Sequence, residues 1–198
     1  MGIYHDRVVP LLIELSMRSR ELEPYRRRLL AQAGGRVLEI GVGAGANLPF
    51  YTGRAAQLVG IEPHPRLVAK AAHGKAEMVA GSAEELPFPG HSIDTVVTRF
   101  TLCTIPDPIR ALREMRRVLK PTGQLLFVEH GLAPEESVQR WQHRLTPFWK
   151  RFAGGCHLDR PIARLVEDAG FAMGPVATGY MPGPKVMTFL YEGSARVK

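Results

Sequence analysis

The sequence predicts an α/β protein with a doubly wound, mostly parallel sheet, closed by an antiparallel C-terminal hairpin and capped by N-terminal helices. Three observations predict it. Apolar strands alternate with amphipathic helices through the first two-thirds of the chain. A glycine-rich turn follows the first strand, and Pro182-Gly183-Pro184 separates two extended segments near the end. With 198 residues, 45% of them hydrophobic, we expect a single domain over 1–198.

The elements follow from apolar runs and turn residues, taken in chain order. Residues 1–33 show helical periodicity on both sides of Pro24, which predicts two short helices. We interpret them as a cap over the cofactor or substrate site rather than as an amphipathic element on a membrane. Strands are expected at 36–40, 57–62, 76–81, 93–98 and 124–129, helices from Ala46 and at 65–73, 106–119 and 160–169, and extended segments at 171–180 and 185–191.

Composition narrows the class of protein. Two cysteines are too few for a disulfide framework, and no secretory signal pattern opens the chain, so we expect a cytoplasmic protein. No apolar run approaches the roughly 20 residues that span a bilayer. The net charge is +7, but the basic residues lie among acids and no nucleic-acid-binding module accompanies them. A nucleic-acid partner is therefore not expected.

The first strand leads into Gly41, Gly43 and Gly45, which let the backbone approach a ligand closely. Glu62 follows at the end of the second strand, about 20 residues further on, where such folds place an acid on ribose hydroxyls. A solvated glutamate at a strand end would give the same spacing. The glycine pattern alone also fits a dinucleotide-binding dehydrogenase.

Four further features favour methyl transfer over hydride transfer. Glu39 lies inside the strand before the loop, and Gly45 is an additional glycine. The segment 81–88 and the terminal hairpin complete the pattern. Together with Glu114-Met-Arg-Arg-Val-Leu-Lys-Pro-Thr-Gly123, these motifs make the chain resemble the class I S-adenosylmethionine-dependent methyltransferases from Arg36 onward.

That resemblance implies a Rossmann-like methyltransferase fold, S-adenosyl-L-methionine as cofactor and S-adenosyl-L-homocysteine as product. It places the glycine loop under the methionine part, Glu39 near the amino group, and Glu62 on both ribose hydroxyls. Many relatives have aspartate where this chain has Ser82, and a hydroxyl is a weaker acceptor for the adenine amino group. The full implied cofactor set is Glu39, Gly41, Gly43, Gly45, Asn47, Glu62, Pro63, Ser82, Ala83, Glu84, Arg99 and Phe100.

Within that family the chain is most similar to the methyltransferase-like 7 group, which includes thiol S-methyltransferases. The motifs that carry this likeness are 45–51, 102–105, 127–130, Trp141, Trp149 and 155–158. It implies a small-molecule acceptor, and a thiol is the first candidate. Quinone or phospholipid methylation and a cofactor-binding module without catalysis are the alternatives.

The acceptor side is expected to involve His130, Arg99 and Cys103 as catalytic candidates, because a thiol reacts as thiolate and a nearby base or cation helps to form it. Cys103 also fits a buried hydrophobe, and His130 a loop residue satisfied by backbone. No metal site is expected, since Cys156-His157 lacks a second pair at ligand spacing. Asp159 is interpreted as the N-cap of the helix from Arg160.

The segment 137–158 contains no acid, and its basic residues alternate with aromatic ones. Its place in the chain resembles the variable cover that the family builds over the acceptor. A peripheral membrane contact through this segment or through residues 7–28 is an alternative that the sequence leaves open.

Overall fold

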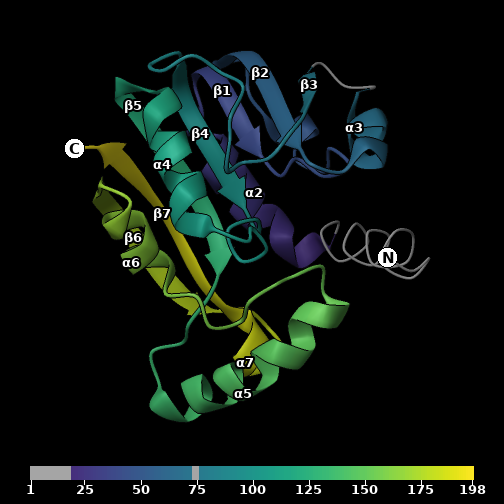
Figure 1. Ribbon diagram of the computed structural model, residues 1–198, viewed down its shortest axis with the longest axis vertical. Coiled ribbons are helices and arrows are strands. Elements are labelled where there is room, and N and C mark those ends of the chain that lie inside the picture. Colours follow the sequence, from purple (N-terminus) through teal and green to yellow (C-terminus); the bar gives the residue numbers. More distant parts are fainter. Residues whose placement is uncertain (1–18, 73–75) are drawn as a thin grey trace.

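The computed structural model describes residues 19–72 and 76–198, and within them seven strands form one sheet (Figure 1). The strand order is β3-β2-β1-β4-β5-β7-β6. The first five strands are parallel, whereas β7 runs antiparallel to both β5 and β6. The strands are β1 (Gly35–Ile40), β2 (Ala55–Glu62), β3 (Glu77–Ala80), β4 (Ile93–Arg99), β5 (Leu119–His130), β6 (Phe171–Tyr180) and β7 (Phe189–Val197).

Helices lie on both faces of this sheet (Figure 1). The described helices are α2 (Glu23–Leu30), α3 (Pro65–Ala71), α4 (Pro108–Val118), α5 (Glu136–Phe152), α6 (Ile162–Asp168) and α7 (Lys185–Thr188), with 3₁₀ turns at η2 (Arg20–Leu22) and η3 (Leu48–Phe50). Along β1, Leu38 packs with α4 and α6 in one core cluster, whereas Val37 packs with α2 in the other. This alternation explains why the parallel strands are apolar on successive residues.

The fold class is confirmed, including the antiparallel C-terminal pair. The expected hairpin has an additional element, because α7 occupies the first residues of the segment 185–191, which the sequence predicts to be extended. Part of the expected N-terminal cap, residues 1–18, lies outside the described residues. Pro24 lies in the first turn of α2, where its missing N–H costs no hydrogen bond. The helix expected before it falls mostly on residues 1–18, outside the described residues.

Two further expectations are wrong. No α-helix follows the glycine loop in the described chain, where the turn η3 takes its place. Asp159 does not cap a helix, because α6 begins at Ile162 and its cap position is Pro161. Asp159 instead contacts the ring Nδ1 of His143 on α5 at 2.9 Å.

Within 19–72 and 76–198, no helix combines the length and the apolar character that crossing a membrane requires.

Candidate active site at the carboxyl ends of the strands

The predicted site residues follow four parallel strands. The glycine loop leaves β1, Glu62 ends β2, Arg99 ends β4 and His130 ends β5. Because the carboxyl ends of parallel strands meet at one edge of a sheet, the fold brings these residues to a common edge. In Figure 1, α5 and α7 lie together beyond the sheet at one end of the molecule.

The glycine loop has the geometry of a ligand cradle. Gly41 has φ +67°, and a Cβ there would lie 2.5 Å from Thr101 Cγ2. Gly43 has φ +57°, and a Cβ there would meet no atom within 4 Å. Gly41 is therefore required by packing, and Gly43 leaves its backbone facing open space that a ligand can enter.

Glu39 is buried at the end of β1 and is held by two side chains from the following loop. Asn47 Nδ2 donates to Glu39 Oε1 at 2.6 Å, and the Tyr51 hydroxyl donates to Oε2 at 2.9 Å. Arg26 Nε on α2 donates to Asn47 Oδ1 at 3.1 Å, which connects the N-terminal helix to the same network. Burial raises the pKa of Glu39 above its ordinary value.

Two buried arginines in this region have N–H groups that find no partner in the described part of the chain. Arg26 Nη2 and Arg99 Nε and Nη1 make no hydrogen bond within the described residues. Burial lowers the pKa of Arg99 to about 10, so its guanidinium remains charged at neutral pH. Buried charged donors without an acceptor are costly, and an anionic ligand group would satisfy them. The methionine carboxylate of S-adenosylmethionine is such a group, so these residues fit the implied cofactor.

Glu62 joins the glycine loop to the start of the next helix. Its Oε2 accepts the Gly43 N–H at 3.1 Å, and its Oε1 accepts the His64 N–H at 3.1 Å. Burial raises the pKa of its carboxyl group. A carboxylate has about four acceptor positions, so two remain for ribose hydroxyls. Pro63, the next residue, is exposed.

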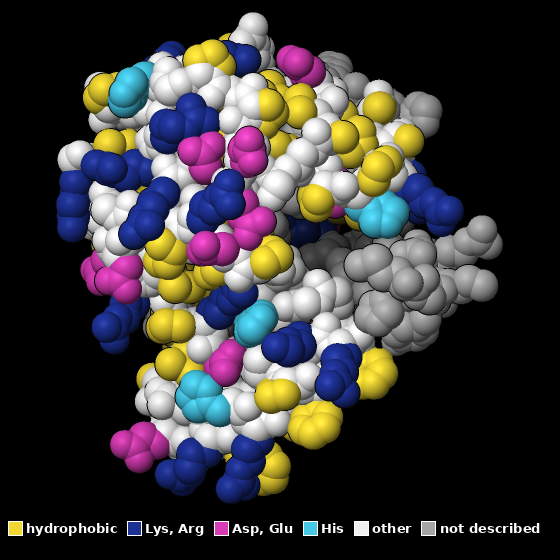
Figure 2. Space-filling view, viewed as in Figure 1, with side chains coloured by type: hydrophobic (Ala, Val, Ile, Leu, Met, Phe, Trp, Pro, Cys, Tyr) yellow, Lys and Arg dark blue, Asp and Glu magenta, His cyan; other side chains and the backbone are white. Residues whose placement is uncertain are grey.

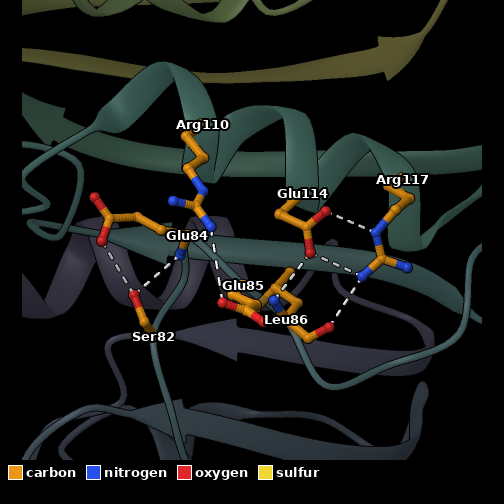
Figure 3. Close-up of polar contacts among 7 residues, drawn as sticks. All are labelled: Ser82, Glu84, Glu85, Leu86, Arg110, Glu114 and Arg117. Atoms are coloured by element: carbon orange, nitrogen blue, oxygen red, sulfur yellow. Dashed lines mark hydrogen bonds and ion pairs between the residues drawn. The ribbon is translucent and has the colours of Figure 1, made fainter.

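The loop after β3 is fastened to α4 (Figure 3). Arg117 donates from Nη2 to the Leu86 carbonyl and from Nη1 to the Phe88 carbonyl, both at 2.9 Å. Glu114 accepts the Leu86 N–H at 2.9 Å.

Ser82 in the same loop bonds locally. Its hydroxyl accepts the Glu84 N–H at 3.2 Å and donates to Glu84 Oε2 at 3.3 Å, as Figure 3 shows. Ala83 between them is buried. Glu84 Oε1 also accepts the Asp107 N–H at 2.7 Å, so this carboxylate fixes the loop as well.

The turn after β4 is strained and is held by Glu129, which sequence reasoning did not single out. Phe100 has φ +52°, an uncommon conformation for a bulky residue. The buried Glu129 carboxylate accepts the N–H groups of Thr101 and Leu102 at 2.9–3.1 Å. Burial raises the pKa of Glu129 to about 7. Glu129 could have been identified in the sequence as an acidic residue near the end of a buried strand, the position that Glu39 has in β1.

Cys103, His130 and Cys156 form a buried cluster close to the carboxyl ends of β4 and β5. Their ligand atoms all lie within 4.8 Å of one another, and His130 Nε2 is 2.9 Å from Cys156 Sγ. Contact with Cys103 and His130 lowers the pKa of Cys156. Arg160 donates to the Leu102 carbonyl beside the cluster. His157, although next to Cys156 in the chain, is not part of the cluster.

A cavity of about 490 Å³ opens at the opposite edge of the sheet, near the amino ends of β1 and β4. Its lining includes Arg54, Asp94 and Gln124, none of which belongs to the predicted site. In open α/β sheets, ligands bind outside the carboxyl ends of the strands, so we assign the site to the glycine-loop edge.

Comparison with known proteins agrees with this geometry. The family model described as "Methyltransferase domain" matches residues 38–127. Thiol S-methyltransferase TMT1B of Rattus norvegicus is 33% identical over 181 residues, which cover 82% of this chain and 74% of that protein. Phosphatidylethanolamine N-methyltransferase of Cereibacter sphaeroides is 34% identical over 157 residues, which cover 74% of this chain and 76% of that protein.

The fold is also shared with a solved structure. An S-adenosylmethionine-dependent methyltransferase of Thermotoga maritima aligns with a TM-score of 0.74 at 22% identity and covers 98% of each chain. These matches confirm S-adenosylmethionine as the cofactor and rule out the dehydrogenase alternative. The chain therefore belongs to the class I S-adenosylmethionine-dependent methyltransferases, close to the TMT1 group of thiol S-methyltransferases.

Proposed function

We propose that this methyltransferase transfers a methyl group to the sulfur of a small-molecule thiol. The observation that carries the proposal is the charge at the acceptor side. Arg99 and Arg160 are both buried at this edge, and Arg99 has two N–H groups without a partner in the described chain. Buried cations stabilise an anionic acceptor such as a thiolate.

The reaction does not require a dedicated acid or base. Methyl transfer from a sulfonium is an in-line displacement in which the positive charge on sulfur disappears as the new bond forms. The protein must position the nucleophile and exclude water. Under this proposal Arg99 attracts the anionic acceptor. His130 and Cys103, which lie with Cys156 at the same edge, help to form the acceptor thiolate.

We also propose how the cofactor is held. Glu62 accepts hydrogen bonds from both ribose hydroxyls, and the backbone of Gly41, Gly43 and Gly45 passes under the methionine part. The Nη2 group of Arg26, for which the described residues offer no partner, supports a role in binding its carboxylate. Glu39, Asn47, Pro63 and Phe100 frame this part of the site. Ala83 lies beside the adenine, with Ser82 and Glu84 shaping the loop.

The test is turnover with matched acceptors. Purified protein and S-adenosylmethionine are incubated with alkyl and aryl thiols, a reduced quinone, or phosphatidylethanolamine, and products are quantified by mass spectrometry. We expect S-adenosylhomocysteine and a methyl thioether in equal amounts with thiols. Arg99→Gln should reduce thiol turnover, whereas Arg54→Gln at the opposite edge should not. Methylated quinol or lipid without any thioether would refute the proposal.

We further propose that α5 contacts an anionic membrane surface, where apolar thiols concentrate. Trp141, Phe148 and Phe152 are each more than half exposed and lie at spacings of 7 and 4 residues, on one face of the helix. Figure 2 shows hydrophobic side chains beside lysines and arginines at this end of the molecule. Apolar residues flanked by basic ones are typical of interfacial helices.

Flotation with vesicles tests this contact. The protein should float with phosphatidylserine-containing vesicles and not with pure phosphatidylcholine, and a Phe148→Ser, Phe152→Ser variant should lose binding. Equal recovery of variant and parent with the anionic vesicles would contradict a contact through α5.

A further inference from the structure

We propose that Cys103, His130 and Cys156 bind one Zn²⁺ ion and leave its fourth coordination position open. The three residues come from separate parts of the chain: the turn after β4, the end of β5 and the loop after α5. All three are buried, and their ligand atoms lie within 4.8 Å of one another. The two thiols and one imidazole form a donor set that zinc prefers.

The distances suit a tetrahedral ion. Zinc bonds of about 2.3 Å to sulfur and 2.0 Å to nitrogen separate neighbouring ligand atoms by roughly 3.5–4 Å. The ligand atoms of Cys103, His130 and Cys156 lie within 4.8 Å of one another, which is compatible with these separations. His130 Nε2 and Cys156 Sγ, at 2.9 Å, must move apart by roughly 0.6 Å, which small side-chain rotations provide.

The backbone around the ligands is already fixed, as a metal site requires. The His157 N–H donates to the Cys103 carbonyl at 2.8 Å, which joins the segments of the two cysteines directly. Glu129 holds the turn that leads to Cys103 through the Thr101 and Leu102 N–H groups. After His130, the Gly131 N–H donates to the Phe189 carbonyl at 3.1 Å. Little further ordering is therefore needed when an ion binds.

Charge also favours a divalent ion here. Two thiolates buried side by side repel each other, whereas two thiolates, a neutral imidazole and Zn²⁺ together carry no net charge. Such a group does not repel the adjacent buried Arg160. Other soft divalent ions match the donors as well, but zinc imposes neither redox chemistry nor a strong preference of geometry.

A zinc ion with three protein ligands keeps one position for water or substrate. At the acceptor side, a thiolate is a ligand that this position favours. This last step rests on the proposed function, whereas binding of the ion does not.

Elemental analysis tests the ion itself, without substrate. Tag-free protein purified with zinc present and then desalted should retain one zinc per chain. Cys103→Ser and Cys156→Ser should each lose it, while the neighbouring His157→Gln variant should keep it. Desalted wild-type protein without zinc, with both thiols still reactive towards a thiol reagent after zinc is added, would overturn the proposal. The zinc content of the wild-type protein tests the proposal even if a variant fails to fold.

Cobalt substitution tests the coordination and the open position. Co²⁺ added to zinc-free protein should give the intense visible bands of a tetrahedral thiolate site, and a small thiol should shift them. Visible bands that do not shift when the thiol is added would refute the open coordination position but not the metal site itself. Zinc binding without methyl thioether formation would refute the proposed acceptor and leave the site established, so the two failures are distinguishable.

Discussion

Glu62 is the residue on which the proposed ribose contact depends most directly. It is buried, and its two oxygens each accept one backbone N–H, from Gly43 and His64. Removing the carboxylate should weaken S-adenosylmethionine binding by about 1–3 kcal/mol, because charged hydrogen bonds to the ribose are lost. Isothermal titration of Glu62→Ala measures this change.

The matched control is Glu77→Ala, on the exposed surface of β3. It should bind like the parent protein. Because Glu62 also orders the glycine loop, the circular dichroism of both variants should be compared with that of the parent. An unchanged dissociation constant for a folded Glu62→Ala protein would exclude the ribose role.

Asp94 makes stability depend on pH. Its carboxylate accepts from Lys120 Nζ at 2.7 Å and from the Arg36 N–H at 2.9 Å, so it links β4 to β1 and β5. These bonds, Lys120 first, lower its pKa below the ordinary 3.8. With a depressed folded-state pKa, the stabilisation is present above 3.8 and is lost as the pH falls through the folded value.

Asp94→Asn should therefore lower the free energy of unfolding by about 1 kcal/mol at pH 7. The difference from the parent should shrink as the pH falls below 3.8. Urea unfolding at a series of pH values measures it. Asp168→Asn, which breaks an exposed pair with Arg164, should change stability by less than about 0.5 kcal/mol. If the difference in the free energy of unfolding between Asp94→Asn and the parent increased as the pH fell, this account would be contradicted.

Some residues of the candidate site follow from local sequence and others do not. Gly41 and Glu62 are identified by spacing along a strand and the turn after it. Cys156 is not, because its contact with His130 spans 26 residues and depends on where α5 ends. Ligand spacing along the chain predicts no metal site here, whereas the cluster of Cys103, His130 and Cys156 forms through tertiary packing, which spacing does not report.

At the scale of elements, α4 determines the shape of the predicted adenine loop. Arg117 holds the carbonyls of Leu86 and Phe88 and pairs with Glu114 (Figure 3). Arg117→Met keeps the length of the side chain but removes these bonds. We expect faster amide exchange at Leu86 and cofactor binding weaker by about 1 kcal/mol, a factor of about five.

Hydrogen exchange resolved over 82–90 and titration with the cofactor measure both effects. Arg113→Met, on the exposed side of the same helix, is the control for loss of a positive charge. Loop exchange that matched in the two variants would show that α4 does not fix the loop through Arg117.

Element boundaries were predictable where the apolar pattern decided them. Strands β1 to β4 lie within a few residues of their expected positions. The helix expected from Ala46 does not form because its side chains have other partners: Asn47 and Tyr51 bond to Glu39, and Phe50 packs under Arg26 and Arg27. Such long-range bonds outweigh local helix propensity and cannot be read from periodicity.

At the scale of the whole molecule, the sheet order places two of the predicted site residues on opposite sides of β1 and β4. Glu62 comes from β2 on one side, and His130 from β5 on the other. The alternation of strands and helices predicts the parallel sheet. In such a sheet the carboxyl ends of the strands lie at one edge, so the location of the site is predictable as well. The sequence predicts an N-terminal cap over the site but does not show which residues make the contact, and in the structure Arg26 of α2 meets Asn47 there.

Because cofactor residues come from several elements across the sheet, binding should stabilise the whole domain. A ligand at 100 times its dissociation constant adds about 2.7 kcal/mol to the folded state. For a domain of this length that raises the Tm by about 5–11 °C. Differential scanning fluorimetry with S-adenosylmethionine should show this rise and, with NAD at the same concentration, none. Glu62→Ala should need more cofactor for the same shift, and an equal rise with NAD would contradict a site specific for S-adenosylmethionine.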